Sequence, residues 1–299
     1  MLTKKEIKDY KEAGRIAVSV TNFARKLVKP ETPLLEIAEK IEDRIYQLGG
    51  KPAFPVGISC NEIAAHYSPL WNDTSKVYGI VKIDFGVCVD GYIVDTAFSI
   101  DLSDDERYKK IINVNEKALL ESIKLIHYGI EIREIGRKIQ EIITSLGFSP
   151  IRNLSGHQIK RYKLHAGITI PNYDNNNSIK LEEGVYAVEP FVTSGIGIVQ
   201  EGKPSGIYEL RNKKPVRDLL ARKILEFIIH EYKTLPFTAR WIVKKFGTRA
   251  LISLNFLEKI DCIYQFPYLV EKSKNIVSQA EDTILVLKDK VVSLTRNSG

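Results

Sequence analysis

The chain has 299 residues, of which 44% are hydrophobic, and its 44 lysines and arginines outnumber its 37 aspartates and glutamates, for a net charge of +7. This is the composition of an ordinary globular protein with one large domain or two modest ones. The three cysteines lack a CxxC spacing and no stretch reaches the roughly 18 apolar residues of a membrane span, which excludes a disulfide framework, a zinc knuckle and a spanning helix.

The start of the chain and the scatter of charge indicate where the protein acts. The chain carries charged side chains from residue 4 onward and lacks the apolar stretch of a secretory signal. The cysteine usage suits a reducing compartment. We therefore expect a cytoplasmic protein without membrane contact. No basic run exceeds two or three residues. A solvated, lysine-rich surface is therefore the favoured interpretation of the net charge, and proximity to a polyanion such as the ribosome is the alternative.

Two helices are predicted near the N-terminus. Apolar residues recur at three- and four-residue steps over residues 7–27, and Lys29-Pro30 ends this pattern. A second helix is expected to begin with Thr32 as its N-cap and Pro33 at its first position, and to stop at residues 49–50, which are both glycine.

The next pair of helices follows a long predicted hairpin. The third helix is expected to start with a capping box over residues 103–106, and the fourth spans about residues 131–146 with Gly147 as its stop signal.

The second and fourth helices are related by a shift of 98 residues. A shared amphipathic pattern could produce this by chance, but the number of identities favours a duplicated half-domain whose two copies face each other across a shared site. The identical pairs are Glu36/Glu134, Ile37/Ile135, Lys40/Lys138, Ile41/Ile139, Ile45/Ile143, Leu48/Leu146, Gly49/Gly147 and Pro52/Pro150.

The hairpin between the two helical pairs carries the sharpest local signal. Asp90-Gly91 lies between two alternating apolar runs and predicts a two-residue turn. That turn places Asp95 opposite Gly86 and puts Asp84 on the same face, while the other face is apolar. Two surface aspartates would be the ordinary explanation. If the face is covered, however, two carboxylates this close are costly unless a cation neutralises them.

Three further residues are candidates for the same metal site. His157 follows a glycine, Glu189 lies in an apolar stretch predicted to be a strand, and Glu281 precedes another such stretch. A buried ion pair is the alternative explanation for Glu189. Four carboxylates and one imidazole suit a pair of divalent transition ions better than a structural zinc.

The texture of the chain changes from about residue 217 to residue 270, within the segment 201–270. Three short helical patterns, at 219–232, 238–246 and 248–257, separate the strand-like stretches 185–193 and 283–287. We expect an inserted helical subdomain here, with residues 1–200 and 271–299 forming the main domain. Its basic residues also resemble those of a small nucleic-acid-binding module, but ordinary packing is favoured and no specific nucleic-acid contact is expected.

Taken together, these motifs resemble the methionine aminopeptidases, and specifically their type 2 branch in its compact archaeal form. The resemblance covers nearly the whole chain, and the order and spacing of the motifs make it specific. The motifs are Phe54-Pro55, residues 61–69 (NEIAAHYSP), Ile83-Asp84-Phe85-Gly86, Val94-Asp95-Thr96-Ala97, Ser155-Gly156-His157, Leu164-His165-Ala166-Gly167, Ala187-Val188-Glu189-Pro190 and Gln279-Ala280-Glu281-Asp282-Thr283.

The resemblance implies an α/β pita-bread (creatinase/aminopeptidase) fold, with two pseudo-symmetric halves, an inserted helical subdomain and two divalent metal ions between the halves. The ions could be cobalt, manganese, iron or zinc. The resemblance also makes Asp95 and Glu281 bridging ligands and implies that Glu189 exchanges a proton. The implied ligands are Asp84, Asp95, His157, Glu189 and Glu281.

The same resemblance assigns His66 and His165 as catalytic histidines that bind substrate without binding metal. A methionine pocket should be apolar, because a thioether offers only dispersion and weak sulfur contacts. Phe54, Pro55 and Leu164 match it. Phe266 stands where animal type 2 enzymes carry a tyrosine, a departure expected to affect inhibitor fit more than chemistry. The lining candidates are therefore Phe54, Pro55, His66, Leu164, His165 and Phe266.

The expected function is hydrolysis of the initiator methionine from nascent polypeptides whose second residue is small, by a monomeric enzyme. An X-Pro peptidase of the same fold is one rival, although those enzymes normally carry an additional N-terminal domain. A metal-free binding protein on the same scaffold, like the proliferation-associated homologues, is a second, but those proteins have lost ligands that this chain retains.

Overall fold

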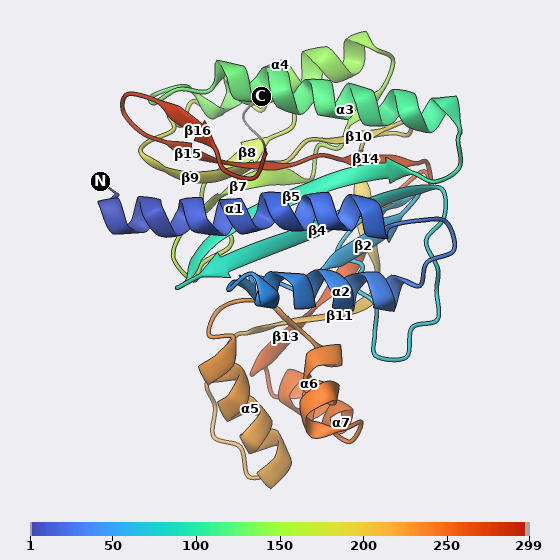
Figure 1. The fold of residues 1–299 in the computed structure, drawn as a ribbon, viewed down its shortest axis with the longest axis vertical. Helices are drawn as coiled ribbons and strands as arrows, with labels where there is room; N and C mark the ends of the chain where they lie inside the picture. Colours follow the sequence, from blue (N-terminus) through green and yellow to red (C-terminus); the bar gives the residue numbers. More distant parts are fainter. Residues whose placement is uncertain (1, 297–299) are drawn as a thin grey trace.

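The computed structural model describes residues 2–296, which contain seven helices and sixteen strands. In Figure 1, α1 and α2 cross the front of the strands, α3 and α4 cover their upper edge, and α5 to α7 form the lower end. The helices are α1 (Lys4–Leu27), α2 (Leu34–Gln47), α3 (Glu106–Leu125), α4 (Ile132–Ser145), α5 (Leu219–Glu231), α6 (Ala239–Phe246) and α7 (Ala250–Lys259). The strands are β1 (Lys51–Pro52), β2 (Gly57–Cys60), β3 (Ile63–Ala65), β4 (Ile80–Val89), β5 (Tyr92–Asp101), β6 (Ser149–Pro150), β7 (Ser155–Ile159), β8 (Thr169–Pro171), β9 (Gly184–Val188), β10 (Phe191–Thr193), β11 (Val199–Leu210), β12 (Phe237–Thr238), β13 (Ile263–Glu271), β14 (Val277–Gln279), β15 (Asp282–Val286) and β16 (Val291–Ser293).

The N-terminal half packs α1 and α2 against the long hairpin of β4 and β5. The hairpin has the predicted register, with Val89 opposite Tyr92 at the turn and Gly86 opposite Asp95. β1 and β2 pair with β4, so the hairpin is the centre of a small antiparallel sheet. Its outer face and the two helices bury one continuous apolar cluster.

The prediction for the start of α2 was wrong by one residue. Pro33, with extended backbone angles, is the N-cap, and no side chain caps the helix. The Thr32 hydroxyl donates instead to the Lys29 carbonyl. Pro33 forms an antiparallel bridge with Lys76, so pairing with a distant segment keeps this residue out of the helix.

In the second half, α3 and α4 pack over two sheets, a three-stranded one in the order β14-β10-β6 and a five-stranded one in the order β16-β15-β9-β7-β8. α4 ends at Ser145 with Leu146 as its C-cap, so Gly147 follows the helix as the predicted stop signal. The predicted capping box at 103–106 was wrong, because Asp105 is the N-cap and accepts from the Arg107 amide. The Ser103 hydroxyl donates instead to Oδ1 of Asp101, at 2.7 Å.

The two halves repeat each other, as the 98-residue shift predicted. The shift carries α2 onto α4 and the start of β1 onto the start of β6. It also carries Gly57, which begins β2, onto Ser155, which begins β7. Each half has its own buried apolar cluster, so the molecule consists of two similar layers facing one another.

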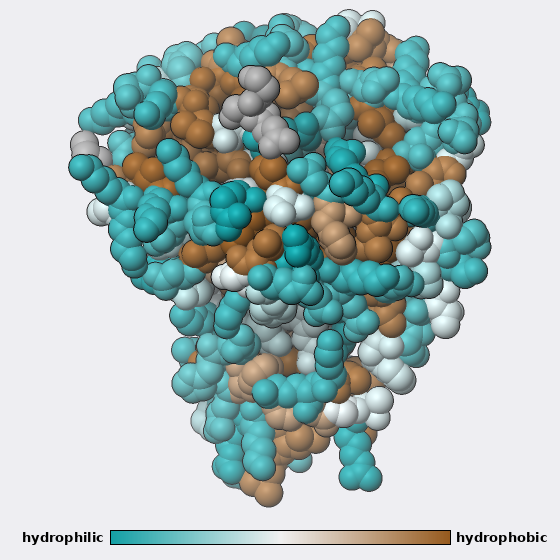
Figure 2. All heavy atoms as spheres, in the orientation of Figure 1, coloured by the Kyte–Doolittle hydropathy of each residue, from teal (hydrophilic) through white to brown (hydrophobic). Residues whose placement is uncertain are grey.

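The helices α5, α6 and α7 lie where three helical patterns were predicted. They enclose a third apolar cluster with the adjoining ends of β11 and β13. On the face shown in Figure 2, hydrophilic residues separate the apolar areas over both the main body and this lower end. Within residues 2–296, none of the helices has the length and apolarity needed to cross a membrane.

Candidate metal and substrate site

The hairpin presents Asp84 and Asp95 to the space between the two halves. Gly86 lies opposite Asp95, and its lack of a side chain is needed, because a Cβ there would lie 2.5 Å from Cε1 of Phe54. The Asp95 amide donates to the Thr283 hydroxyl, which in turn donates to the Asp95 carbonyl, both at 2.7 Å. These bonds join β5 to β15 of the other half and fix Asp95 at the interface.

The other half supplies His157, Glu189 and Glu281. His157 lies on β7 opposite Ala187 of β9. The prediction that Glu189 lies within a strand was wrong, because Glu189 and Pro190 form a break between β9 and β10. A matching break at Ala280 and Glu281 separates β14 from β15, and the four strands pair on both sides of it. At these two breaks, both glutamates lie outside the paired strands.

The five predicted ligands come together in two groups that share Glu281. One group is Asp95, His157 and Glu281, and the other is Asp84, Glu189 and Glu281, each with its ligand atoms within 4.8 Å of one another. Nε2 of His157 lies 3.5 Å from Oδ2 of Asp95. Asp95, His157 and Glu281 are almost fully buried.

The electrostatics of this cluster call for a cation. Both carboxylate oxygens of Glu281, with Oδ1 of Asp84 and of Asp95, are buried without a hydrogen-bond partner among the described residues. Burial raises the pKa of Asp95 to about 8, and burial with repulsion from Asp95 raises the pKa of Asp84 and of Glu281 well above the usual range. Unpaired buried carboxylate oxygens at this spacing are what divalent ions bind, so the donor set fits two such ions.

Burial lowers the pKa of His157 to about 4, so its ring is neutral at pH 7. A neutral imidazole can donate a lone pair to a metal ion, as the assignment of His157 to the ligand set requires.

Gln279 belongs to the site, and the sequence analysis gave it no role. Its Nε2 donates to Oδ2 of Asp84 at 2.9 Å and to Oε1 of Glu189 at 2.8 Å. One amide group thus connects a ligand candidate from each half. Its spacing could have indicated this role, because Gln279 lies at the end of β14, two residues before Glu281.

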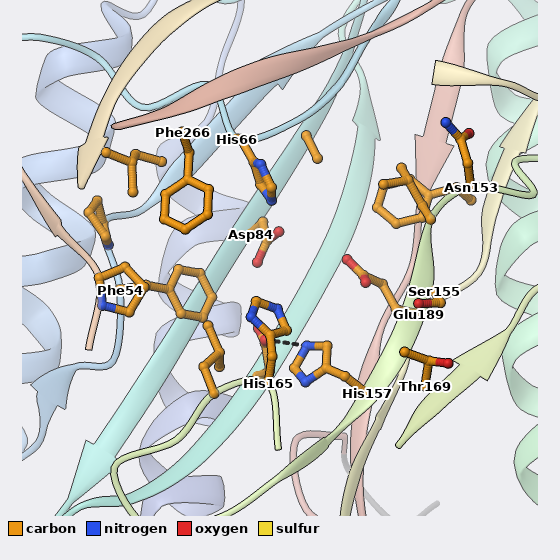
Figure 3. A pocket seen from close by; sticks show the side chains of 18 of the residues that line it. Phe54, His66, Asp84, Asn153, Ser155, His157, His165, Thr169, Glu189 and Phe266 are labelled. Atoms are coloured by element: carbon orange, nitrogen blue, oxygen red, sulfur yellow. Dashed lines mark ion pairs between the residues drawn. The ribbon is translucent and has the colours of Figure 1, made fainter. Parts of the chain in front are cut away.

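A pocket of about 410 Å³ opens onto this cluster. Figure 3 shows Phe54 and Phe266 on one side of the acidic residues and Asn153, Ser155 and Thr169 on the other. Every predicted ligand except Glu281 lines the pocket, as do all the predicted substrate contacts, namely Phe54, Pro55, His66, Leu164, His165 and Phe266.

The pocket also has apolar lining residues for which no role was predicted, among them Ile207 on β11 and Pro236 just before β12. Neither lies in a recognisable motif, so only the folded chain identifies them.

His66 and His165 lie on either side of the pocket, close to the acidic cluster (Figure 3). The His165 ring packs edge-on against His157, with centroids 4.4 Å apart. His66 has a φ of 64°, an uncommon left-handed conformation for a non-glycine residue. Burial, then repulsion from His165, lowers the pKa of His66 to about 4. A neutral His66 ring can donate one hydrogen bond and accept another.

Known proteins resemble this chain in sequence and in fold. Residues 8–241 match metallopeptidase family M24. The chain is 46% identical over 297 residues to the methionine aminopeptidase of Methanocaldococcus jannaschii, an alignment covering 97% of this chain and 100% of that one. The solved methionine aminopeptidase of Thermotoga maritima has a TM-score of 0.72 and 24% identity, covering 99% and 98% of the two chains. The prolidase of Pyrococcus furiosus has a TM-score of 0.61 and 19% identity, and the match covers 99% of this chain but 65% of the prolidase.

Proposed function

The chain belongs to metallopeptidase family M24, and its near end-to-end match to archaeal methionine aminopeptidases makes it a metal-dependent aminopeptidase that removes N-terminal methionine; we propose how the side chains of its pita-bread fold carry out this reaction. The observation that supports the proposal best is the pair of acidic groups that share Glu281. We propose that two divalent ions are held by Asp84, Asp95, His157, Glu189 and Glu281.

Because Glu281 belongs to both groups, its carboxylate would hold both ions, and we propose the same role for Asp95, whose charge acts on Asp84, Glu189 and Glu281. When bound, such ions lower the pKa of water towards neutrality and polarise the scissile carbonyl. The surrounding carboxylates supply the negative charge that retains the ions.

The remaining residues bind substrate and move protons. Glu189 lines the pocket beside the acidic cluster, where its carboxylate can exchange a proton with water and with the leaving amine. His66 and His165 flank the same space and donate hydrogen bonds to the substrate carbonyl as negative charge develops on it.

The apolar side of the pocket, with Phe54, Pro55, Leu164 and Phe266, receives the methionine side chain. The residue after methionine then lies close to the acidic cluster. We propose that the acidic cluster and the two histidines confine this position, which would favour small second residues.

A comparison of peptides tests this function. Protein stripped of metal and reloaded with cobalt, manganese, iron or zinc should hydrolyse Met-Ala-Ser. It should cleave Ala-Pro and Met-Pro far more slowly, and Met-Leu-Ser less well than Met-Ala-Ser. Preferred cleavage of Ala-Pro would instead support an X-Pro peptidase.

We propose that residues 201–270 are a unit inserted into a main domain formed by residues 1–200 and 271–299. The separate apolar cluster around α5, α6 and α7 supports this division. We further propose that the protein acts in the cytoplasm as a monomer, on polypeptides that leave the ribosome.

A further inference from the structure

A buried ion pair joins α2 to α6. Arg240 donates from Nη1 to Oε2 of Glu42 at 2.7 Å and from Nη2 to Oε1 at 2.8 Å. Nε1 of Trp241 also donates to Oε2 of Glu42, at 2.8 Å. Glu42 is 4% exposed and Arg240 is 3% exposed. The carboxylate therefore has a bidentate partner and a third donor at a place closed to water.

Two buried apolar side chains would join two helices without the desolvation that a buried ion pair requires. We therefore look for the role of the charged pair in the backbone groups that it also bonds to. Both side chains have backbone partners outside their own helices, and each of those partners belongs to a segment next to the substrate pocket.

The first partner lies just after Phe54 and Pro55. The amide of Val56 donates to Oε1 of Glu42 at 3.3 Å. Phe54 and Pro55 line the side of the pocket assigned to methionine. Glu42 therefore fixes the end of the segment that carries these two side chains.

The second partner lies just after His66. Nε of Arg240 donates to the carbonyl of Pro69 at 3.2 Å. His66 is held in its left-handed conformation three residues earlier, where a small displacement of the backbone would move the ring.

Arg240 itself connects the third wall of the pocket. It lies two residues after Thr238, which caps α6 and pairs with Ile207 of β11. Ile207, which pairs with Phe266, and Pro236 both line the pocket. The Glu42–Arg240 pair thus links three segments that carry pocket-lining residues.

We propose that Glu42 and Arg240 are positioning residues that hold the three walls of the methionine pocket in register. This inference rests on the proposed function, because it takes that side of the pocket as the place where methionine binds. A second ion pair offers a matched control. Nζ of Lys51 lies 2.7 Å from Oε1 of Glu231, which also ties the main body to α5, but both side chains are well exposed, and among residues 2–296 neither side chain bonds to the backbone of a segment that lines the pocket.

The test compares Arg240→Lys, Glu42→Gln and Trp241→Phe with the control Lys51→Met, all loaded with the same metal. The substrates are Met-Ala-Ser and the same peptide with 2-aminobutyrate in place of methionine, whose shorter side chain makes less contact with the walls. For Arg240→Lys and Glu42→Gln, we expect kcat/KM on Met-Ala-Ser to fall about tenfold through KM, as suits a lost hydrogen bond to a charged group. The loss on the shorter peptide should be clearly smaller, with metal content and kcat nearly unchanged.

Trp241→Phe keeps the ion pair and removes one donor, so it should fold even if the other variants do not, and should show the same selective loss at about threefold. An equal loss on both peptides would overturn the inference, because it would indicate fewer active molecules and no effect on the pocket. A matching selective loss in Lys51→Met would also overturn it, since any tie to α5 would then suffice. Failure of the wild-type protein to cleave Met-Ala-Ser with any metal would overturn the proposed function, and the inference with it.

Discussion

At the scale of single residues, the site depends on carboxylates that ordinary packing would not tolerate. Asp84 and Asp95 lie on one face of a hairpin, and Glu281 contributes two oxygens without hydrogen-bond partners among residues 2–296. Such a cluster is stable only when positive charge is added, so affinity for divalent ions follows from the arrangement itself. The histidines differ from one another, because only His157 shares a group with these carboxylates.

This difference predicts distinct effects for three alanine substitutions. His157→Ala should weaken metal retention, because it removes a neutral ligand. His66→Ala and His165→Ala should keep their metal and slow turnover by roughly 10²-fold or more, the usual scale for substrate-contacting groups. Metal content by elemental analysis, with kcat on Met-Ala-Ser, separates the two outcomes. Equal metal loss in all three variants would contradict the assignment.

Gln279 supports a second prediction at this scale. Gln279→Leu removes the amide that orients Asp84 and Glu189 and should weaken metal affinity by about 10- to 100-fold, as is typical for groups that hold ligands in place. Metal titration measures this. Gln265→Leu is a control for the loss of a glutamine amide, because Gln265 is half-buried and lies on β13 outside the pocket lining. Unchanged affinity in Gln279→Leu would show that the two carboxylates need no such support.

At the scale of elements, the apolar periodicity and the turn residues predicted the helices and the hairpin correctly. The helix caps predicted at Thr32 and at residues 103–106 were wrong. The register of β4 and β5 followed from Asp90-Gly91, because a two-residue turn leaves only one pairing. Thr32 and Ser103 looked like helix caps, yet the Thr32 hydroxyl donates to the Lys29 carbonyl and the Ser103 hydroxyl donates to the Asp101 carboxylate. Capping depends on backbone angles that distant pairing sets, as the bridge between Pro33 and Lys76 shows, and a local pattern cannot include that pairing.

The repeat makes a prediction about the two equivalent helices. Ile41 of α2 and Ile139 of α4 occupy matching positions, and both are fully buried. Ile41→Ala and Ile139→Ala should each lower the free energy of unfolding by about 2 to 5 kcal/mol, as methylene loss in a packed core does. The exposed Lys40→Ala should cost less than about 0.5 kcal/mol. Urea denaturation measures all three. A negligible cost at either isoleucine would contradict the equivalence of the two layers.

At the scale of the whole molecule, the site exists only where the two halves and the region around α5 meet. The sequence predicted the two halves through the 98-residue shift, and it predicted each ligand candidate through its motif. It could not predict Ile207 and Pro236 as pocket walls, nor the link from Glu42 to Arg240, because residues 198 positions apart carry no local sign of contact. Contacts of this kind depend on how the elements pack, and no short pattern encodes them.

Because both halves supply candidate ligands, we expect metal removal to weaken the molecule as a whole as well as stop the reaction. Ions that bind only the folded state stabilise it by about 4 kcal/mol at a concentration 1,000 times Kd. For a protein of this size, that corresponds to a rise in Tm of roughly ten degrees. Chelator-stripped protein should therefore melt earlier and fail to cleave Met-Ala-Ser, and a divalent transition ion should restore both properties. Glu281→Gln should gain much less Tm from the same ion, because it loses charge from the carboxylate that both ligand groups share. Full activity in metal-free protein, or an equal gain in Tm for Glu281→Gln, would contradict a metal centre built between the halves.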